Sequence, residues 1–328
     1  MTIISGWPAL TVALSNRASP ARLFIQERFG RWQDLQARYR ESVGPLVVPG
    51  SQANPGTIGS AFDWMVRFMV HPSPDLRLAL LGARTPPLRH AVHELARTLN
   101  YSQTGDSVGT CRFSGPAAGS EADHQLLARA CWALALLTDL YRVGPTPGSP
   151  LMALAPRSIN AEKLLELAPP AALDELQTLR AFAERSLLPS LSARHGAWAL
   201  GPTFAGSSLM NADADLIAAG LLLELKTGLG SKHRDGTRRS SLEAPTIMQL
   251  LGYVLLDFPD EFAIEAVGVY SARYAHLTTL RLPELLAELA GRPVDLKEER
   301  VAFRQLLHSC STGDHFSPRV GDHLCSPE

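Results

Sequence analysis

The sequence predicts an α/β protein that joins a mostly helical N-terminal region to a C-terminal region of strands and helices. Over residues 1–195, apolar side chains recur at helical spacing, whereas from about residue 197 short apolar runs alternate with turn residues. The chain has 328 residues, and 45% of them are hydrophobic, which is enough for a well-buried core. We expect a helical region over 1–195, an α/β core with C-terminal helices over 196–308, and a loose tail over 309–328.

The N-terminal region is expected to contain several amphipathic helices. Ser19 is a candidate N-cap, and Pro20 fits the first turn of a helix that continues to about residue 42. Further helices are expected over 58–70, 86–99, 121–142, 159–167 and 171–191. The connecting segments 44–57, 100–120 and 144–157 are expected to be irregular, because they are rich in Gly, Pro, Ser or Asn.

The C-terminal region is expected to alternate strands and helices. Strands are predicted over 208–217 and 220–227, followed by a polar loop over 228–243 and a helix that has Pro245 in its first turn and ends near Leu256. A second hairpin is predicted over 262–270 and 274–280, and two helices over 282–290 and 295–308.

The first hairpin carries the most informative pattern in the chain. Two apolar runs flank a small turn at residues 218–220. Folding the chain about this turn places Asp215 opposite Glu224 and Asp213 opposite Lys226. Side chains two residues apart on a strand share a face, so all four charged groups are expected to project from one face.

Three carboxylates and one ammonium group suit a divalent metal site. Such a patch is costly to desolvate without a ligand, and carboxylates hold hard cations such as Mg²⁺ or Mn²⁺. The alternative is a solvated face with cross-strand Asp–Lys pairing. Leucines on the opposite face favour the metal site, because they anchor the hairpin in a core: Leu216, Leu221, Leu223 and Leu225. Pairing with Glu224 makes Asp215 the primary ligand, with Asp213 as the other candidate.

The order Asp215, Glu224-Leu225-Lys226 resembles the Asp…(Asp/Glu)-x-Lys core of the PD-(D/E)xK nuclease superfamily. Thr227-Gly228 and the downstream Gln249…Tyr253 pair, which matches a Gln-x-x-x-Tyr motif, are similar to the RecB/Cas4-like branch. The resemblance covers roughly residues 195–281. It implies a restriction-endonuclease-like core, which is a small mixed sheet flanked by helices, and hydrolysis of DNA phosphodiester bonds.

The resemblance also implies roles for single residues. Asp215 and Glu224 would hold Mg²⁺ or Mn²⁺, and the Leu225 carbonyl would be an extra ligand. Lys226 would position the attacking water or neutralise developing charge on the phosphate. Gln249 would contact metal-bound water or DNA, and Tyr253 would line the site. The alternative for this pair is a helix whose tyrosine packs at the edge of the core.

Two further metal expectations come from the same resemblance. Asp63 is a candidate ligand in place of an upstream histidine of the related nucleases, although it could equally be a helix carboxylate paired with Arg67 at i+4. Some relatives hold an iron–sulfur cluster with three closely spaced cysteines after the Gln-x-x-x-Tyr motif. Here only Cys310 and Cys325 follow that motif, so no iron–sulfur cluster is expected.

The charge of the chain limits how it could bind DNA. Its net charge is −1 and its pI is about 6.8, so any DNA contact must come from a local basic patch. The loop over 231–239 supplies such a patch, and Arg273 is a further candidate. The loop residues suited to phosphate contacts are Lys232, Arg234, Arg238 and Arg239. The alternative is an ordinary solvated loop.

The cysteines and the absence of a P-loop motif limit the cellular location and the partners that we expect. Four widely spaced cysteines make no disulfide framework and favour a cytoplasmic protein, and no membrane association is expected. A nucleotide-binding P-loop is lacking, so any motor would be another chain. We expect a nuclease used in antiviral defence or DNA processing with a protein partner that supplies targeting or motor activity. The alternative is a non-catalytic nucleic-acid-binding or scaffold subunit, and endonuclease action and oligomerisation stay open.

Overall fold

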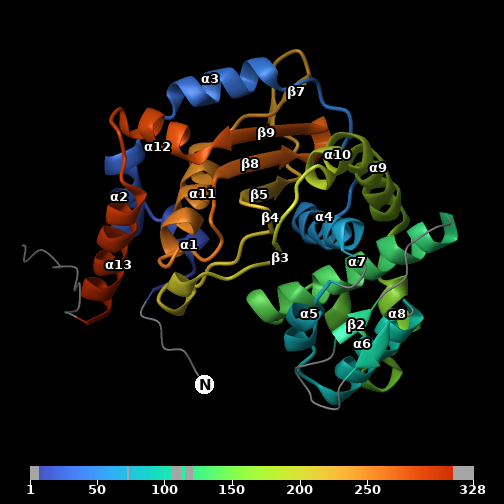
Figure 1. Cartoon of the computed structure of the whole chain (residues 1–328). Helices are drawn as coiled ribbons and strands as arrows, with labels where there is room; N and C mark the ends of the chain where they lie inside the picture. Colours follow the sequence, from blue (N-terminus) through green and yellow to red (C-terminus); the bar gives the residue numbers. More distant parts are fainter. Residues whose placement is uncertain (1–6, 72–73, 100, 105–111, 115–120, 313–328) are drawn as a thin grey trace, which may run out of the picture.

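The computed structural model describes residues 7–71, 74–99, 101–104, 112–114 and 121–312. A mixed five-stranded sheet lies at its centre, with helices on both faces, so the predicted α/β class is confirmed (Figure 1). The strand order is β3-β4-β5-β8-β9. The strands are β3 (Trp198–Leu200), β4 (Leu216–Ala218), β5 (Leu221–Lys226), β8 (Ala266–Ser271) and β9 (His276–Arg281).

The register of the first hairpin agrees with the prediction. β4 runs antiparallel to β3 and β5, and Leu216 faces Leu223, which is the alignment that places Asp215 level with Glu224. Ala219 and Gly220 form the turn with φ values of 45° and 77°. Two successive residues with positive φ are typical of the type I′ turn that joins tight hairpins. β5 then pairs in parallel with β8, which pairs antiparallel with β9.

The strand before the turn is shorter than the predicted 208–217. A 3₁₀ turn (η3, Ala205–Ser208) precedes it, and the Ser207 hydroxyl donates to the Ala212 carbonyl at 2.7 Å. Asp213 forms only an isolated bridge with Thr203. The prediction that Asp213 lies opposite Lys226 on the same strand pair is therefore wrong, because ladder pairing with β5 begins only at Leu216.

The sheet separates two hydrophobic cores. On β5, Leu221 and Leu223 belong to one core and Leu222 to the other, as alternation along a strand requires. The first core contains α4 (Pro55–Val70), α7 (Glu121–Arg142) and α9 (Pro170–Ser186). The second contains α1 (Leu10–Ser15), α2 (Pro20–Phe29), α11 (Ala244–Leu256), α12 (Leu282–Ala290) and α13 (Leu296–Thr312). Burial on both faces is usual for paired parallel strands such as β5 and β8.

Two predicted helices are interrupted in the structure. The predicted helix over 20–42 is divided into α2 and α3 (Gln33–Ser42), and α2 ends at Gly30. The predicted helix over 171–191 is divided into α9 and α10 (Leu188–Ser192). Pro189 lacks the N–H that a continuous helix would use at that position, which explains the second break. In contrast, α7 has the predicted bounds and α11 closely matches its prediction.

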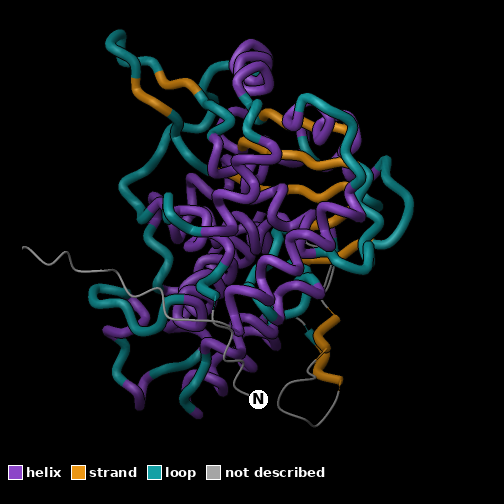
Figure 2. The backbone as a smooth tube through the Cα atoms, turned by 90° about the vertical axis from the view of Figure 1, so that its left-hand side faces the viewer, coloured by secondary structure: helices purple, strands orange, loops and turns teal. Residues whose placement is uncertain are grey.

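The remaining elements are short or lie at the edges of the fold. They are α5 (Arg77–Gly82), α6 (Pro86–Thr98), α8 (Ala161–Glu166), η1 (Pro150–Ala153), η2 (Pro156–Ser158), η4 (Ala272–Tyr274), β1 (Ser102–Thr104), β2 (Arg112–Ser114), β6 (Ser231–Lys232) and β7 (Arg238–Arg239). β6 and β7 pair within the segment predicted as a loop, and they project from the body of the molecule (Figure 2). Within the described part of the chain, no helix combines the length and apolarity needed to cross a membrane.

Candidate metal-dependent active site

The predicted site residues meet where β4 and β5 separate. Asp215 precedes β4, and its Oδ2 accepts the backbone N–H of Leu225 at 2.7 Å. This hydrogen bond holds the aspartate against the strand that carries Glu224 and Lys226. The hairpin thus brings Asp215 to the Glu-x-Lys sequence, as its register predicts.

A chain of hydrogen bonds links β5 to α11. Lys226 Nζ donates to Glu224 Oε1 at 2.8 Å and to Gln249 Oε1 at 3.2 Å. Gln249 Nε2 donates to the Tyr253 hydroxyl at 2.7 Å. The Tyr253 ring stacks on Phe204, with ring centroids 5.5 Å apart. The Glu-x-Lys and Gln-x-x-x-Tyr motifs therefore form one connected polar group, and Tyr253 also packs at the core edge.

The two carboxylates are held in an environment that disfavours their charge. Glu224 is 5% exposed, and its Oε2 atom has no hydrogen-bond partner among the described residues. Burial raises the pKa of Asp215 well above its usual value, and the charges of Glu224 and Asp63 raise it further. Burial also raises the pKa of Glu224, although Lys226 opposes that shift. A cation between the carboxylates would relieve both effects.

Asp63 on α4 approaches the same site from the first core. It forms an ion pair with Arg67 (Nη2 to Oδ2, 2.7 Å), as the i+4 alternative proposed, and its charge also raises the pKa of both Asp215 and Glu224. Arg67 is 4% exposed. Burial lowers the pKa of Arg67, but Asp63, Asp215 and Asp213 more than reverse that effect. Arg67 is thus a buried positive charge at the site, and sequence reasoning considered it only as the partner of Asp63.

Asp213 lies at the margin of this group. Its carboxylate forms an ion pair with Arg142, at the C-terminal end of α7, and both side chains are partly exposed. Asp213 does contribute to the electrostatic environment of Arg67 and Tyr253. Its own charge is already balanced, so Asp215 is the stronger candidate ligand.

Arg273 is not available as a DNA contact in this structure. The side chain is 3% exposed and forms a buried ion pair with Glu175 of α9. Its other guanidinium donors bond the carbonyls of Thr227, Val48 and Pro49. The prediction that Arg273 contacts DNA is therefore withdrawn, because the guanidinium is buried and its Nε, Nη1 and Nη2 atoms are all bonded to protein groups.

The basic residues of the predicted loop have a different environment. Lys232, Arg234 and Arg239 are exposed, and Arg238 is half-buried and donates to the Gly230 carbonyl at 3.1 Å. No salt bridge neutralises these four side chains within the part of the chain that the structure describes. They are accessible to an anionic ligand.

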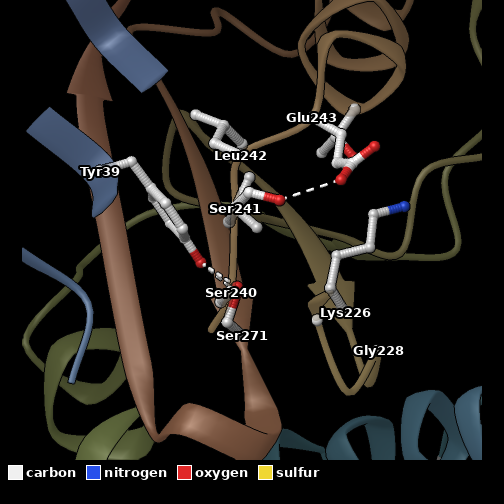
Figure 3. A pocket seen from close by; sticks show the side chains of 11 residues that line it. Tyr39, Lys226, Gly228, Ser240, Ser241, Leu242, Glu243 and Ser271 are labelled. Carbon is white, nitrogen blue, oxygen red and sulfur yellow. Dashed lines mark hydrogen bonds between the residues drawn. The ribbon is translucent and has the colours of Figure 1, made fainter. Parts of the chain in front are cut away.

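A pocket of about 190 Å³ borders the site beside Lys226 (Figure 3). It lies between the end of β5 and the start of α11. On one wall, the Tyr39 hydroxyl makes hydrogen bonds with Ser240 Oγ (2.9 Å) and Ser271 Oγ (2.6 Å). Lys226 lines the other wall, and its side chain is 38% exposed. The pocket therefore gives solvent, and a polar ligand, direct access to Lys226.

The donor set fits Mg²⁺ or Mn²⁺ in chemistry, but the carboxylates do not form a closed cage. No group of three or more His, Cys, Asp or Glu side chains among the described residues is arranged to hold a metal. Mg²⁺ commonly uses one or two carboxylates and takes its other ligands from water and substrate phosphates. Asp215, Glu224 with its unpartnered Oε2, and the Leu225 carbonyl match that pattern.

The cysteines give no information on a cluster. Cys131 is a buried free thiol on α7, and burial raises its pKa well above the usual value. Cys111 and Cys325 lie outside the described residues, as does the side chain of Cys310.

Comparisons of the chain with protein-family models, curated proteins and solved structures found no significant match.

Proposed function

We propose that this protein is a Mg²⁺- or Mn²⁺-dependent nuclease that hydrolyses phosphodiester bonds in DNA. The observation that carries the proposal is the convergence of Asp215, Glu224 and Lys226 beside Gln249 and Tyr253. These residues come from two strands and a helix, and their order in the sequence resembles that of PD-(D/E)xK nucleases. The mixed sheet flanked by helices is compatible with that family core.

Each residue has a task in this proposal. Asp215, Glu224 and the Leu225 carbonyl hold the cation, which would lower the pKa of a bound water and stabilise charge on the phosphate. Lys226 orients the attacking water or neutralises the negative charge that develops at phosphorus. Gln249 keeps the Lys226 ammonium in place, with an Oε1 to Nζ distance of 3.2 Å. The Tyr253 hydroxyl stays protonated, because burial and the nearby carboxylates raise its pKa.

In this proposal, Asp63 would be an additional metal ligand that is recruited only when it is released from Arg67. Its carboxylate forms an ion pair with Arg67, so it would join the metal only if that ion pair opens. The near-neutral charge of the chain further supports a protein partner that delivers it to DNA, as in a defence or DNA-processing complex.

The second candidate is a non-catalytic nucleic-acid-binding or scaffold subunit with the same fold. The observation that favours it is the pairing of the site groups with each other, with Lys226 on Glu224 and Arg67 on Asp63. Such pairing would stabilise a site that never receives a metal. Divalent-dependent cleavage separates the two candidates.

The test is cleavage of circular single-stranded and supercoiled double-stranded DNA with Mg²⁺ or Mn²⁺. Wild type is compared with Asp215→Asn, Glu224→Gln and Lys226→Met, each checked for folding. Asp174→Asn is the matched control, because Asp174 is an exposed aspartate on α9. We expect each site variant to lose at least about 100-fold in rate, the size of effect typical of groups that stabilise transition-state charge. Wild-type inactivity without metal binding would reject the nuclease and leave the scaffold.

Asp213→Asn is expected to have a much smaller effect than Asp215→Asn. The carboxylate of Asp213 pairs with Arg142 in a partly exposed position, and such pairs contribute about 0–1 kcal/mol. Asp213 is not a cation ligand in this proposal, so the activation barrier should change by no more than about 1 kcal/mol, which is about 5-fold in cleavage rate. A loss as large as that of Asp215→Asn would show that Asp213 is the primary ligand instead.

A further inference from the structure

The most prominent charged feature outside the carboxylate site is the short ribbon formed by β6 and β7, residues 231–239. Its register pairs Ser231 with Arg239 and Lys232 with Arg238. Four basic residues and one aspartate give it a formal charge of +3, in a chain whose net charge is −1. The ribbon therefore concentrates positive charge in a single projecting element (Figure 2).

The ribbon is built to hold its shape. At the tip, the His233 N–H donates to the Thr237 carbonyl at 2.8 Å, and Asp235 Oδ1 accepts both the N–H and the hydroxyl of Thr237. At the base, the Tyr274 hydroxyl donates to the Leu229 carbonyl at 2.7 Å. An ordinary solvated loop needs neither set of bonds. A preorganised ribbon loses less conformational entropy when it binds.

We propose that this ribbon enters the major groove of duplex DNA, which makes B-form duplex DNA the substrate of the neighbouring site. This inference rests on the proposed nuclease function. The major groove is about 12 Å wide and 8.5 Å deep and admits a two-stranded ribbon. About four residues lie between the base and the tip, and at about 3.3 Å per residue they span roughly 13 Å, which is enough to reach the groove floor.

The basic side chains of the ribbon are distributed as this placement requires. Side chains alternate along a strand, so the cross-strand pair Lys232 and Arg238 points to one face of the ribbon and Arg239 to the other. A ribbon inserted tip-first has a phosphate backbone on each side, and each face then meets one backbone. Ser231 follows Lys226 by five positions, which is at most about 17 Å of extended chain. One groove wall would therefore lie beside the carboxylate site.

The same geometry discriminates against other nucleic acids. The major groove of A-form RNA is too deep and narrow for side chains to read. A single strand has no groove, so it could contact only some of the ribbon's cations at one time. Duplex DNA is thus expected to bind more tightly than duplex RNA or single-stranded DNA of the same sequence.

The first experiment measures affinity of the full chain for 30-mer duplex DNA, duplex RNA and single-stranded DNA in Ca²⁺. The test variant is Lys232→Ser/Arg234→Ser/Arg239→Ser, which leaves Arg238 and its bond to Gly230 in place. The matched control, Arg77→Ser/Arg84→Ser/Arg97→Ser, removes three exposed charges from α5, α6 and the intervening loop, far from the ribbon (Figure 1).

We expect the affinity for duplex DNA to fall at least 30-fold in the ribbon variant and less than 3-fold in the control. The slope of log affinity against log salt should fall in magnitude by about 2.7, for three lost phosphate contacts. A ribbon variant that loses no more than the control overturns the inference. The inference is also overturned if the ribbon variant loses as much affinity for single-stranded DNA as for duplex DNA, because a groove contact must favour the duplex.

A second experiment tests groove entry itself. Guanine N7 faces the major groove, so bound wild type should protect it from methylation by dimethyl sulfate. Replacing residues 233–237 with Asn-Gly shortens the ribbon but keeps the Lys232–Arg238 pair, because Asn-Gly favours a two-residue hairpin turn. Protection should disappear in this variant. Protection that persists, or that is absent in wild type, overturns the inference.

The outcomes also separate the ribbon from the nuclease. Divalent-dependent cleavage with no ribbon-dependent preference for duplex DNA overturns the groove inference and leaves the nuclease intact. Ribbon-dependent duplex binding without cleavage overturns the nuclease and leaves the groove-binding ribbon.

Discussion

Replacing Asp215 with Asn is expected to abolish DNA cleavage and, in the same protein, to stabilise the metal-free fold. Asp215 is held near Glu224 and Asp63, and burial and these charges raise its pKa. An amide at this position keeps an acceptor for the Leu225 N–H but removes the repulsion. The expected gain is on the order of 1–2 kcal/mol, which corresponds to about 2–4 °C in Tm.

The pH dependence of this gain has a defined sign. Because the folded-state pKa of Asp215 is raised, the folded protein retains a proton at pH values where the unfolded chain has lost it. Stability of the metal-free wild type should therefore fall as the pH rises above about 4 and through the raised pKa. The difference in Tm between Asp215→Asn and wild type should grow over this interval, which thermal unfolding in EDTA would measure.

Addition of Mg²⁺ provides the complementary result. A ligand that binds only the folded state raises stability, so wild type should gain Tm with Mg²⁺ and Asp215→Asn should not. The control is Asp174→Asn, which should follow wild type in both conditions. A variant that is less stable than wild type at pH 7.5 in EDTA would show that Asp215 stabilises the fold and is not a strained ligand.

Arg273→Met is expected to be the most destabilising single substitution at a charged residue of the later hairpin. Arg273 and Glu175 are each 3% exposed at the side chain, and Glu175 Oε2 also accepts the Ser51 N–H at 2.6 Å. Removing the guanidinium leaves Glu175 buried without its charged partner, which costs about 3–5 kcal/mol. Urea unfolding would show this as a lower midpoint with an unchanged slope.

Two further variants distinguish charge burial from lost packing. Arg281→Met is the matched control on the same hairpin, because Arg281 and its partner Glu284 are 77% and 70% exposed. That pair should contribute no more than about 1 kcal/mol. The double variant Arg273→Met/Glu175→Leu should recover at least half of the loss, because it removes the unpaired carboxylate. A cost for Arg273→Met as small as that for Arg281→Met would contradict a stabilising role for the buried Arg273–Glu175 ion pair.

The sequence predicts most reliably the features that depend on residues close together in the chain. The turn at Ala219-Gly220 fixes the register of the first hairpin, so the apposition of Asp215 and Glu224 followed from a few neighbouring residues. The helix carrying Gln249 and Tyr253 was predicted for the same reason. The fold class followed from the change in apolar periodicity near residue 197.

The errors concern residues whose environment is set by distant parts of the chain. Asp213 is held by Arg142, 71 residues earlier, and Arg273 by Glu175, 98 residues earlier. Neither partner could be identified from spacing. The parallel pairing of β5 with β8 and the position of Arg67 beside Asp215 likewise depend on how the helices pack against the sheet.

The position of the sheet late in the sequence has a consequence for synthesis of the protein. The helices α1, α2, α4, α7 and α9 emerge before any strand of the central sheet, which is completed only at Arg281. α4, α7 and α9 pack on one another, whereas α1 and α2 pack on α11, α12 and α13. The contacts of α1 and α2 therefore form late and over long sequence separations. In nascent chains arrested before about residue 281, α1 and α2 should therefore remain sensitive to protease, and they should become resistant once α12 and α13 have been made.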